Sequence, residues 1–147
     1  MGPRGRLQGR ALARVNLFVD TSVWSLAFRR DRPPNEPAVD RLHRALDSGE
    51  AVLSTGLVLQ ELLQGFAGRK ARAAIVERFA ALPLLVPDRD DHIAAAHIRN
   101  GCRRAGIQIG TIDALLARLC VRHDLVMLTT DRDFERMRPH ANLSIWS

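Results

Sequence analysis

The sequence predicts an α/β protein in which a mostly parallel sheet is flanked by helices. Short apolar segments of strand length alternate along the chain with longer segments whose apolar residues recur every three or four positions. Turn residues that would join neighbouring strands directly as hairpins are too few for an antiparallel sheet. Because strands that alternate with helices are typical of a parallel sheet with helices packed on its faces, we expect an α/β sandwich.

The predicted fold begins with one strand and two helices. Residues 17–19 form a short apolar run of strand type, and Ser22 is a favourable N-cap for a helix over residues 23–28. Apolar residues at helical spacing over residues 39–46 predict a second helix, which Gly49 ends. This order, a strand followed by helices, starts the alternation.

The alternation of strands and helices continues in the middle of the chain. Residues 51–54 predict a second strand, and residues 56–65 predict a helix that ends among the glycines that follow. Another amphipathic helix is predicted over residues 69–81. Residues 84–86 lie between two prolines and predict a third strand.

The last third of the chain predicts two further helices and a fourth strand. Asp90 is the expected N-cap of a helix that continues to residue 106, and Thr111 is the expected N-cap of a helix that continues to residue 120. Residues 126–128 predict a strand, after which Asp131 opens a short helical turn. The apolar segment 143–146 closes the chain.

Length and composition indicate one domain. A chain of 147 residues can bury one core and is short for two. No apolar run reaches the roughly 18 residues that a membrane helix needs, so we expect no membrane partner. Residues 1–14 are rich in glycine and arginine without periodicity, so we expect them to be disordered and the folded domain to span residues 15–147.

The net charge of +6 is weak evidence for a polyanionic partner, because four arginines of residues 1–14 account for most of it. Local clusters are more informative, and Arg69, Lys70 and Arg72 could contact phosphates. Cys102 and Cys120 have no zinc-ligand spacing and are expected to be core thiols. Unpaired cysteines without a secretory signal favour the cytoplasm.

Acidic residues stand at the edges of apolar segments along the whole chain. Asp20 follows the first predicted strand and Asp131 and Asp133 follow the fourth, whereas Glu61 and Asp113 belong to predicted helices. Sites in open parallel sheets form outside the carboxyl ends of the strands, so these acids can meet at one edge. Carboxylates that are partly desolvated beside apolar residues repel one another, and a divalent cation relieves that repulsion. Such a metal site suits phosphodiester hydrolysis.

Each acid also has a structural interpretation. Asp20, Asp113 and Asp131 can each serve a helix as an N-cap or as a first-turn acid that meets the helix dipole, and for each one alone this is the commoner role. Glu61 fits that interpretation least, because it stands in mid-helix among leucines, although one face of an amphipathic helix can be hydrated.

Four motifs together resemble a known family. They read Val19-Asp-Thr-Ser-Val-Trp24, Gln60-Glu-Leu-Leu-Gln-Gly65, Thr111-Ile-Asp-Ala-Leu-Leu-Ala117 and Leu128-Thr-Thr-Asp-Arg-Asp-Phe134. In order and spacing they resemble the PIN-domain ribonucleases of the VapC toxin type, over residues 15–146. The resemblance implies a PIN-like three-layer sandwich with a mostly parallel central sheet.

The resemblance also implies the roles of the acids. Asp20, Glu61 and Asp113 would be catalytic acids that bind Mg²⁺, or Mn²⁺ in its place. Asp131 or Asp133 would be the fourth acid, and spacing does not choose between them. Ser22 resembles the small hydroxyl residue near the first acid, where it would hydrogen-bond a ligand or a carboxylate, or only cap the helix.

The implied activity is endonucleolytic cleavage of single-stranded or loop RNA by the toxin of a toxin–antitoxin pair. The implied partners are RNA, a cognate antitoxin and a second copy of the chain. Tyrosine is absent and only two tryptophans and five phenylalanines are present, so we expect limited base stacking. Two alternatives stay open: a metal-dependent phosphatase, although the second acid typical of that chemistry is replaced by Ser22, and a non-catalytic RNA-binding module.

Overall fold

A computed structural model describes residues 15–29 and 35–147 of the chain. They form an α/β sandwich around a five-stranded sheet of order β3-β2-β1-β4-β5, in which every neighbouring pair is parallel. The predicted fold class is confirmed. The expected disorder of residues 1–14 falls outside the described residues. The strands are β1 Leu17–Val19, β2 Val52–Thr55, β3 Leu84–Leu85, β4 Val126–Leu128 and β5 Ser144–Ile145.

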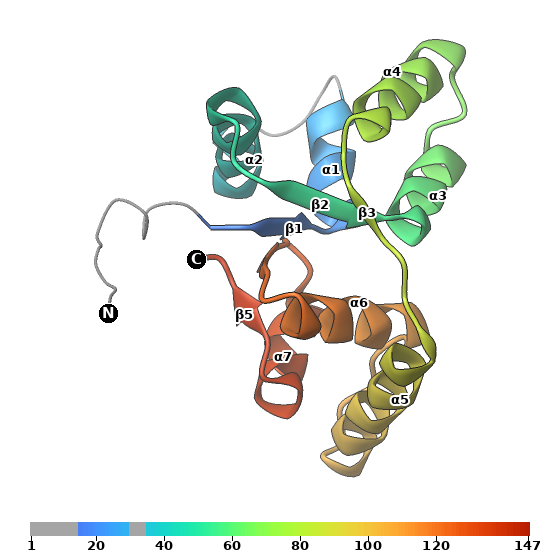
Figure 1. Ribbon diagram of the computed structural model, residues 1–147, viewed down its shortest axis with the longest axis vertical. Helices are drawn as coiled ribbons and strands as arrows, with labels where there is room; N and C mark the ends of the chain where they lie inside the picture. Colours follow the sequence, from blue (N-terminus) through green and yellow to red (C-terminus); the bar gives the residue numbers. More distant parts are fainter. Residues whose placement is uncertain (1–14, 30–34) are drawn as a thin grey trace.

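Helices cover both faces of the sheet. Figure 1 shows α1 to α4 above the sheet and α5 to α7 below it, which gives three layers. The helices are α1 Thr21–Phe28, α2 Pro37–Ser48, α3 Gly56–Gly65, α4 Arg69–Ala80, α5 Arg89–Arg104, α6 Thr111–Arg122 and α7 Arg132–Ala141.

The central strand β1 lies between β2 and β4. Its three residues, Leu-Phe-Val, are completely buried, as expected for a parallel strand that is covered on both faces. Leu17 is in register with Val52 on one side and with Val126 on the other. This complete burial explains why the strand appears in the sequence as an apolar run without alternating polar residues.

The order of the strands changes direction at β1. The chain runs outward from β1 to β2 and β3, and then returns to place β4 on the other side of β1. In open parallel sheets this change of direction leaves a crevice beyond the carboxyl ends of the two adjacent strands. The segments that follow β1 and β4 meet there, and the backbone N–H of Asp20 donates to the carbonyl oxygen of Leu128 at 3.0 Å.

Three helix starts differ from their predictions. Asp20, not Ser22, is the N-cap of α1, because its carboxylate rather than the Ser22 hydroxyl accepts a first-turn N–H. Asp88, not Asp90, caps α5, since Asp88 and the residue three positions later exchange side-chain to backbone hydrogen bonds as a capping box. Gly110 precedes α6 without a side-chain cap, and Thr111 is the first helical residue.

The carboxyl-terminal helix α7 is longer than the single turn that the sequence predicts. It has ten residues and ends at Asn142, which takes the left-handed conformation at φ 57°. Phe134, Met137 and Ala141 are its buried residues, at helical spacing between charged ones. The many charged side chains hide this narrow apolar stripe in the sequence.

Both cysteines are buried free thiols on the adjacent helices α5 and α6, which confirms that they belong to the core. Burial raises the pKa of the Cys102 thiol and of the Cys120 thiol, and the charge of Asp20 adds to the effect at Cys120. Within the described ranges, no helix combines the length and the apolar composition that crossing a bilayer requires.

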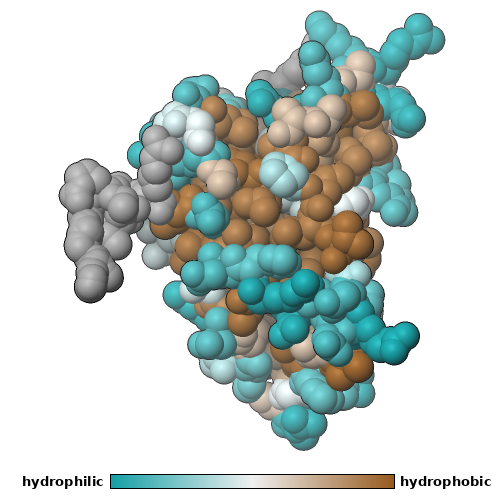
Figure 2. Space-filling model, in the orientation of Figure 1, coloured by the Kyte–Doolittle hydropathy of each residue, from teal (hydrophilic) through white to brown (hydrophobic). Residues whose placement is uncertain are grey.

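The surface is unevenly apolar. Figure 2 shows apolar side chains gathered over the upper half of the molecule, where β2, β3 and the helices above the sheet lie, while the lower half is mainly hydrophilic. Val76 of α4, Leu84 of β3 and Val86 just after it are among the exposed large apolar residues. The edge strand β3 is therefore flanked by apolar surface.

Candidate metal centre

The structure gathers acidic side chains at the crevice beyond β1 and β4. Asp20 follows β1, Asp131 caps α7, Asp133 lies in its first turn and Asp113 lies in the first turn of α6. One carboxylate oxygen from each of Asp113, Asp131 and Asp133 lies within 4.8 Å of the others. These three acids, which are far apart in the sequence, thus form one cluster.

Electrostatics link the other two acids to this cluster. The pKa of Asp113 is raised from 3.8 to about 6, first because the carboxyl is partly buried and then because Asp20, Asp131, Glu61 and Asp133 are negatively charged nearby. Like charges at short distance disfavour the ionised form. The other four sequence-predicted acids therefore all lie close enough to Asp113 to act on its carboxyl.

Hydroxyl groups hold Asp20 in place. Its Oδ2 accepts hydrogen bonds from the Ser22 hydroxyl at 2.8 Å, from the Thr129 hydroxyl at 2.9 Å and from the backbone N–H of Ser22 at 3.4 Å. No donor from the described part of the chain reaches Oδ1. Asp20 is 5% exposed as a residue. One of its oxygens is thus fixed by these donors, and the other has no hydrogen-bond donor from the described residues.

Thr129 is a site residue that the sequence did not reveal. Its hydroxyl donates to Asp20 and accepts the backbone N–H of Asp131 at 2.9 Å. The Ser22 hydroxyl, 3.3 Å from that of Thr129, accepts the N–H of Thr130 at 3.0 Å. These bonds join the start of α1 to the loop before α7. The signal in the sequence for these contacts was the pattern of hydroxyl residues beside acids, in Asp-Thr-Ser and Thr-Thr-Asp.

Glu61 lies on α3 and differs from its expectation. The sequence suggested an acid partly desolvated by its leucine neighbours, but Glu61 is exposed while Val58 and Leu62 form the buried side of the helix. The Thr21 hydroxyl donates to its Oε1 at 2.8 Å. Glu61 therefore contributes a hydrated carboxylate at the rim of the cluster.

Asp131 and Asp133 each have a second role in α7. Oδ1 of Asp131 accepts the backbone N–H of Asp133 at 2.9 Å, as the helix N-cap. The carboxylate of Asp133 forms an ion pair with Arg136, one turn along the helix. Both acids also reach the cluster with Asp113, so the structure brings both candidates for the fourth acid to the same place.

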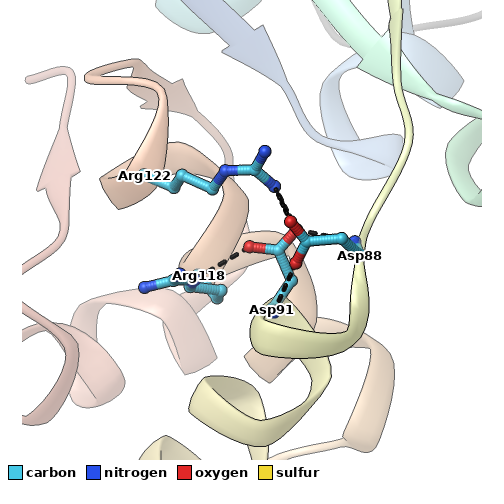
Figure 3. Close-up of polar contacts among 4 residues, drawn as sticks. All are labelled: Asp88, Asp91, Arg118 and Arg122. Atoms are coloured by element: carbon cyan, nitrogen blue, oxygen red, sulfur yellow. Dashed lines mark hydrogen bonds and ion pairs between the residues drawn. The ribbon is translucent and has the colours of Figure 1, made fainter.

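A separate polar cluster fixes the helix that carries Asp113. Figure 3 shows Asp91, at the start of α5, between Arg118 and Arg122 of α6. Oδ1 of Asp91 accepts from Arg118 Nε at 2.9 Å, Oδ2 pairs with Arg122, and the N–H of Asp88 donates at 2.9 Å. Burial raises the pKa of Asp91, but these donors together lower it below its usual value. The cluster ties α6 to α5.

The acidic cluster fits a hard divalent cation. All of its candidate ligands are carboxylate oxygens, the donors that Mg²⁺ and Mn²⁺ prefer. The pKa of Asp113 is raised first by partial burial and then by the negative charges of the neighbouring acids, which a bound cation would offset. Arg136 is a nearby cation, and it pairs with Asp133 alone among these acids. The site can therefore bind a metal ion and, through it, a phosphate group.

Comparisons with known proteins agree with this geometry. Residues 17–138 match the family model described as the PIN domain. The chain is 30% identical over 129 residues to VapC ribonuclease Mb1587 of Mycobacterium bovis, covering 86% of this chain and 95% of that protein. Ribonuclease VapC11 of Mycobacterium tuberculosis shows the same identity and coverage.

Solved structures share the fold. The structure of FitAcB from Neisseria gonorrhoeae superposes with a TM-score of 0.67 at 22% identity, over 89% of this chain and 96% of that one. The structure of VapBC2 from Rickettsia felis bound to a DNA fragment from its promoter gives 0.68 at 18% identity, over 89% and 98%.

Proposed function

We propose that this chain, which belongs to the PIN-domain family, is a metal-dependent endoribonuclease and the toxin of a toxin–antitoxin pair. The observation that carries the proposal is the meeting of four acids around Asp113 beyond the carboxyl ends of β1 and β4. Relatives at 30% identity are described as VapC ribonucleases, which supports RNA as the substrate.

We assign metal binding to Asp20, Asp113 and Glu61, with Asp131 and Asp133 as the candidates for the fourth acid. Mg²⁺ is the proposed ion, and Mn²⁺ is an alternative with the same ligand preference. When bound, the ion would ionise a water molecule and offset negative charge on the attacked phosphate.

The protein side chains have defined tasks in this scheme. Thr129 and Ser22 hold one oxygen of Asp20 by hydrogen bonds and leave the other for the metal ion. Thr21 holds one oxygen of the exposed Glu61, so that the rest of its carboxylate meets water at the rim. We assign to Ser22 the positioning of Asp20 in addition to the substrate contact that the family resemblance implies.

We propose a cognate antitoxin and a second copy of the chain as partners. Solved neighbours described as VapBC complexes support the first. For the second, a mainly apolar groove of about 420 Å³ between α3, α5 and α6 is lined by Leu57, Ala95 and Ile112, and Ile93 of α5 is also exposed. The cytoplasm is the proposed compartment, because both thiols are free.

The proposed function is tested by incubating the purified chain with total RNA, in Mg²⁺ or Mn²⁺ and in EDTA. The wild type is expected to cleave RNA only with metal. Asp20→Asn removes a charged ligand, so its cleavage is expected to fall to the level seen in EDTA while its thermal unfolding stays cooperative. Asp90→Asn, an exposed acid on α5, is the matched control and should cleave like the wild type.

Four results would contradict the proposal. Full cleavage by Asp20→Asn, or undiminished cleavage in EDTA, would exclude a metal nuclease at these acids. Hydrolysis of small phosphomonoesters without RNA cleavage would indicate the phosphatase alternative. RNA binding without cleavage under any metal condition would indicate a non-catalytic RNA-binding module.

A further inference from the structure

A second groove lies beside the acidic site, at the other end of α1. It has a volume of about 640 Å³ and is formed by the end of α1, the end of α3 and the start of α4. Phe28 and Phe66 supply its aromatic surface, and Arg29, Arg69 and Lys70 supply its cationic rim. Among the described residues, no carboxylate lines it.

The aromatic side chains form a supported surface. The rings of Phe28 and Phe66 meet edge to face, with centroids 6.4 Å apart and planes at 68°. Trp24 stacks behind Phe28 at 6.0 Å and also contacts Phe79 of α4. Both phenylalanines are half-buried, so their rings are held by the core and still border the groove. The open face of an aromatic ring that is held in this way is what an unpaired nucleobase stacks on.

The cations of the rim are available to a ligand. Arg29, Arg69 and Lys70 are all exposed, and none of the ion pairs within the described ranges involves them. A polyanion would therefore meet three positive charges that no carboxylate of residues 15–29 and 35–147 pairs with.

The start of α4 adds to this preference for an anion. Gly68 is its N-cap and offers no side-chain acceptor, and the first turn has no acidic residue. Arg69 and Lys70 occupy the first turn instead, where their positive charges add to the positive end of the helix dipole and are repelled by it. A bound phosphate would offset both the side-chain charges and the dipole, so the groove is electrostatically matched to a phosphate chain.

Two helices connect the groove to the acids. Asp20 caps α1 and Phe28 is its last helical residue, while Glu61 and Phe66 are five positions apart at the end of α3. With a rise of about 1.5 Å per residue, the aromatic surface lies roughly 7 to 12 Å further along these helices than the acids. A single extended strand can occupy both places at once.

We propose that this groove binds an unpaired base of single-stranded RNA, together with its flanking phosphates, while the scissile bond lies at the acids. The inference rests on the proposed ribonuclease function and adds a substrate subsite to it. It also changes the expectation of limited base stacking, since two of the five phenylalanines border one groove next to the acids. A protein helix would use the apolar surface but would leave the three cations unused unless it were acidic.

The first test measures RNA affinity by fluorescence anisotropy, with a short labelled RNA that has no secondary structure. The full chain carries Asp20→Asn and is kept free of metal, so that no RNA is cleaved. Arg69→Gln combined with Lys70→Gln is expected to weaken binding. It should also flatten the dependence of log Kd on log salt by about 0.7 for each lost phosphate contact.

A matched control removes the same charge elsewhere. Arg103→Gln combined with Arg104→Gln changes two exposed cations at the end of α5, outside the groove. This pair is expected to leave the affinity and the salt dependence close to those of the parent. Equal losses from both pairs would show a response to net charge alone and would overturn the groove as a binding site.

The second test separates stacking from a structural role. Phe66→Leu is expected to weaken RNA binding about fivefold or more, because it removes one base-stacking surface, whereas Phe66→Tyr should bind like the parent. On an abasic ribose-phosphate strand of the same length, Phe66→Leu should bind like the parent. A loss on both strands would mean that Phe66 only supports the fold, and would overturn the base contact.

Failure of the groove can be told apart from failure of the proposed function. If the wild type cleaves RNA with Mn²⁺ while the groove variants keep parental affinity, the groove proposal is wrong and the nuclease stands. If the wild type neither binds nor cleaves RNA, both are wrong. If the variants keep RNA affinity but lose a helical protein partner, the groove is a protein site. Should Phe66→Leu fail to fold in circular dichroism, the glutamine pair still decides.

Discussion

Asp113 is the acid whose protonation is most affected by the other acids of the site. It stands at the start of α6 among four other carboxylates, and its pKa is raised to about 6 by partial burial and by their charges. An arrangement that disfavours its own ionised state is typical of a functional site, where a ligand supplies the missing positive charge. The same feature makes the stability of the metal-free protein depend on pH.

We predict that Asp113→Asn removes part of this pH dependence. Below about pH 3.8 the Asp113 carboxyl is protonated in both the folded and the unfolded chain, so its contribution to stability is fully present. This contribution is lost as the pH rises through the folded-state pKa of about 6. In EDTA, the free energy of unfolding of the wild type should therefore fall relative to Asp113→Asn across this window. Urea unfolding measures the difference, and Asp47→Asn, an exposed acid on α2, should follow the wild type. Parallel curves for wild type and Asp113→Asn would refute the assigned cause.

The sequence revealed the acids but not the groups that hold them. Asp20 follows an apolar run and Asp113 follows a glycine-containing segment. Both acids were recognisable because these motifs occur in the order that the family resemblance implies. The role of Thr129 depends on a hydrogen bond to a residue 109 positions away, which no local pattern contains. Ser22 was assigned as a helix cap or a ligand contact, and in the folded chain its hydroxyl serves the carboxylate of Asp20.

At the scale of elements, the pairing of α5 with α6 determines where Asp113 lies. Asp91 is fully buried at the start of α5, and Arg118 and Arg122 reach it from the far half of α6. Asp113 is in the first turn of the same helix. The ion pairs therefore fix the orientation of a helix that presents its other end to the acidic site.

We predict that Asp91→Ala destabilises the protein by about 3 kcal/mol, the lower end of the range for breaking a buried ion pair, because both arginines keep some access to water. Asp90→Ala, in the same turn but exposed, should change stability by roughly 0.5 kcal/mol or less. Urea unfolding at neutral pH measures both.

The contribution of Asp91 should also depend on pH. Because the pKa of Asp91 is lowered in the folded chain, its stabilisation is present above its usual value of 3.8 and is lost as pH falls below it. A loss under about 1 kcal/mol for Asp91→Ala at neutral pH would show that the cluster does not hold the two helices together.

The elements were predicted better than their ends. Each helix and four of the five strands of the described chain have a counterpart in the pattern of the sequence, because period and glycine or proline position are local properties. The segment that forms β5 was recognised only as apolar. Asp88 and Asp91 were missed as a capping box, and the burial of Asp91 was not foreseen. A charged residue next to two other acids reads as exposed, and its burial follows only from arginines on another helix.

At the scale of the whole molecule, the sequence predicted a parallel sheet and one edge where the acids meet. It did not predict the strand order, which depends on where each helix packs rather than on any single segment. The order β3-β2-β1-β4-β5 places the ends of β1 and β4 side by side, and the acids follow from that placement. The match of residues 17–138 to the PIN-domain model agrees with this arrangement.

We predict that a chain starting at Val15 retains the unfolding transition and the RNA cleavage of the full chain. The five acids, the second groove and all strands lie within residues 15–29 and 35–147. Thermal unfolding and the total-RNA assay measure the comparison. A truncated chain that folds normally but binds RNA more weakly would instead assign a substrate contact to the arginines of residues 1–14.

The position of β4 in the sheet has a consequence for the synthesis of the protein. Asp20 is made early, but its hydroxyl partner Thr129 and the neighbouring acids Asp131 and Asp133 come from the far end of the chain. On the ribosome, a growing chain that stops short of these residues has β1 without one of its two neighbouring strands. A cell that translates this gene would therefore meet the assembled site only after the segment from Thr129 to Asp133 has emerged, and fragments that end before this segment would be inactive.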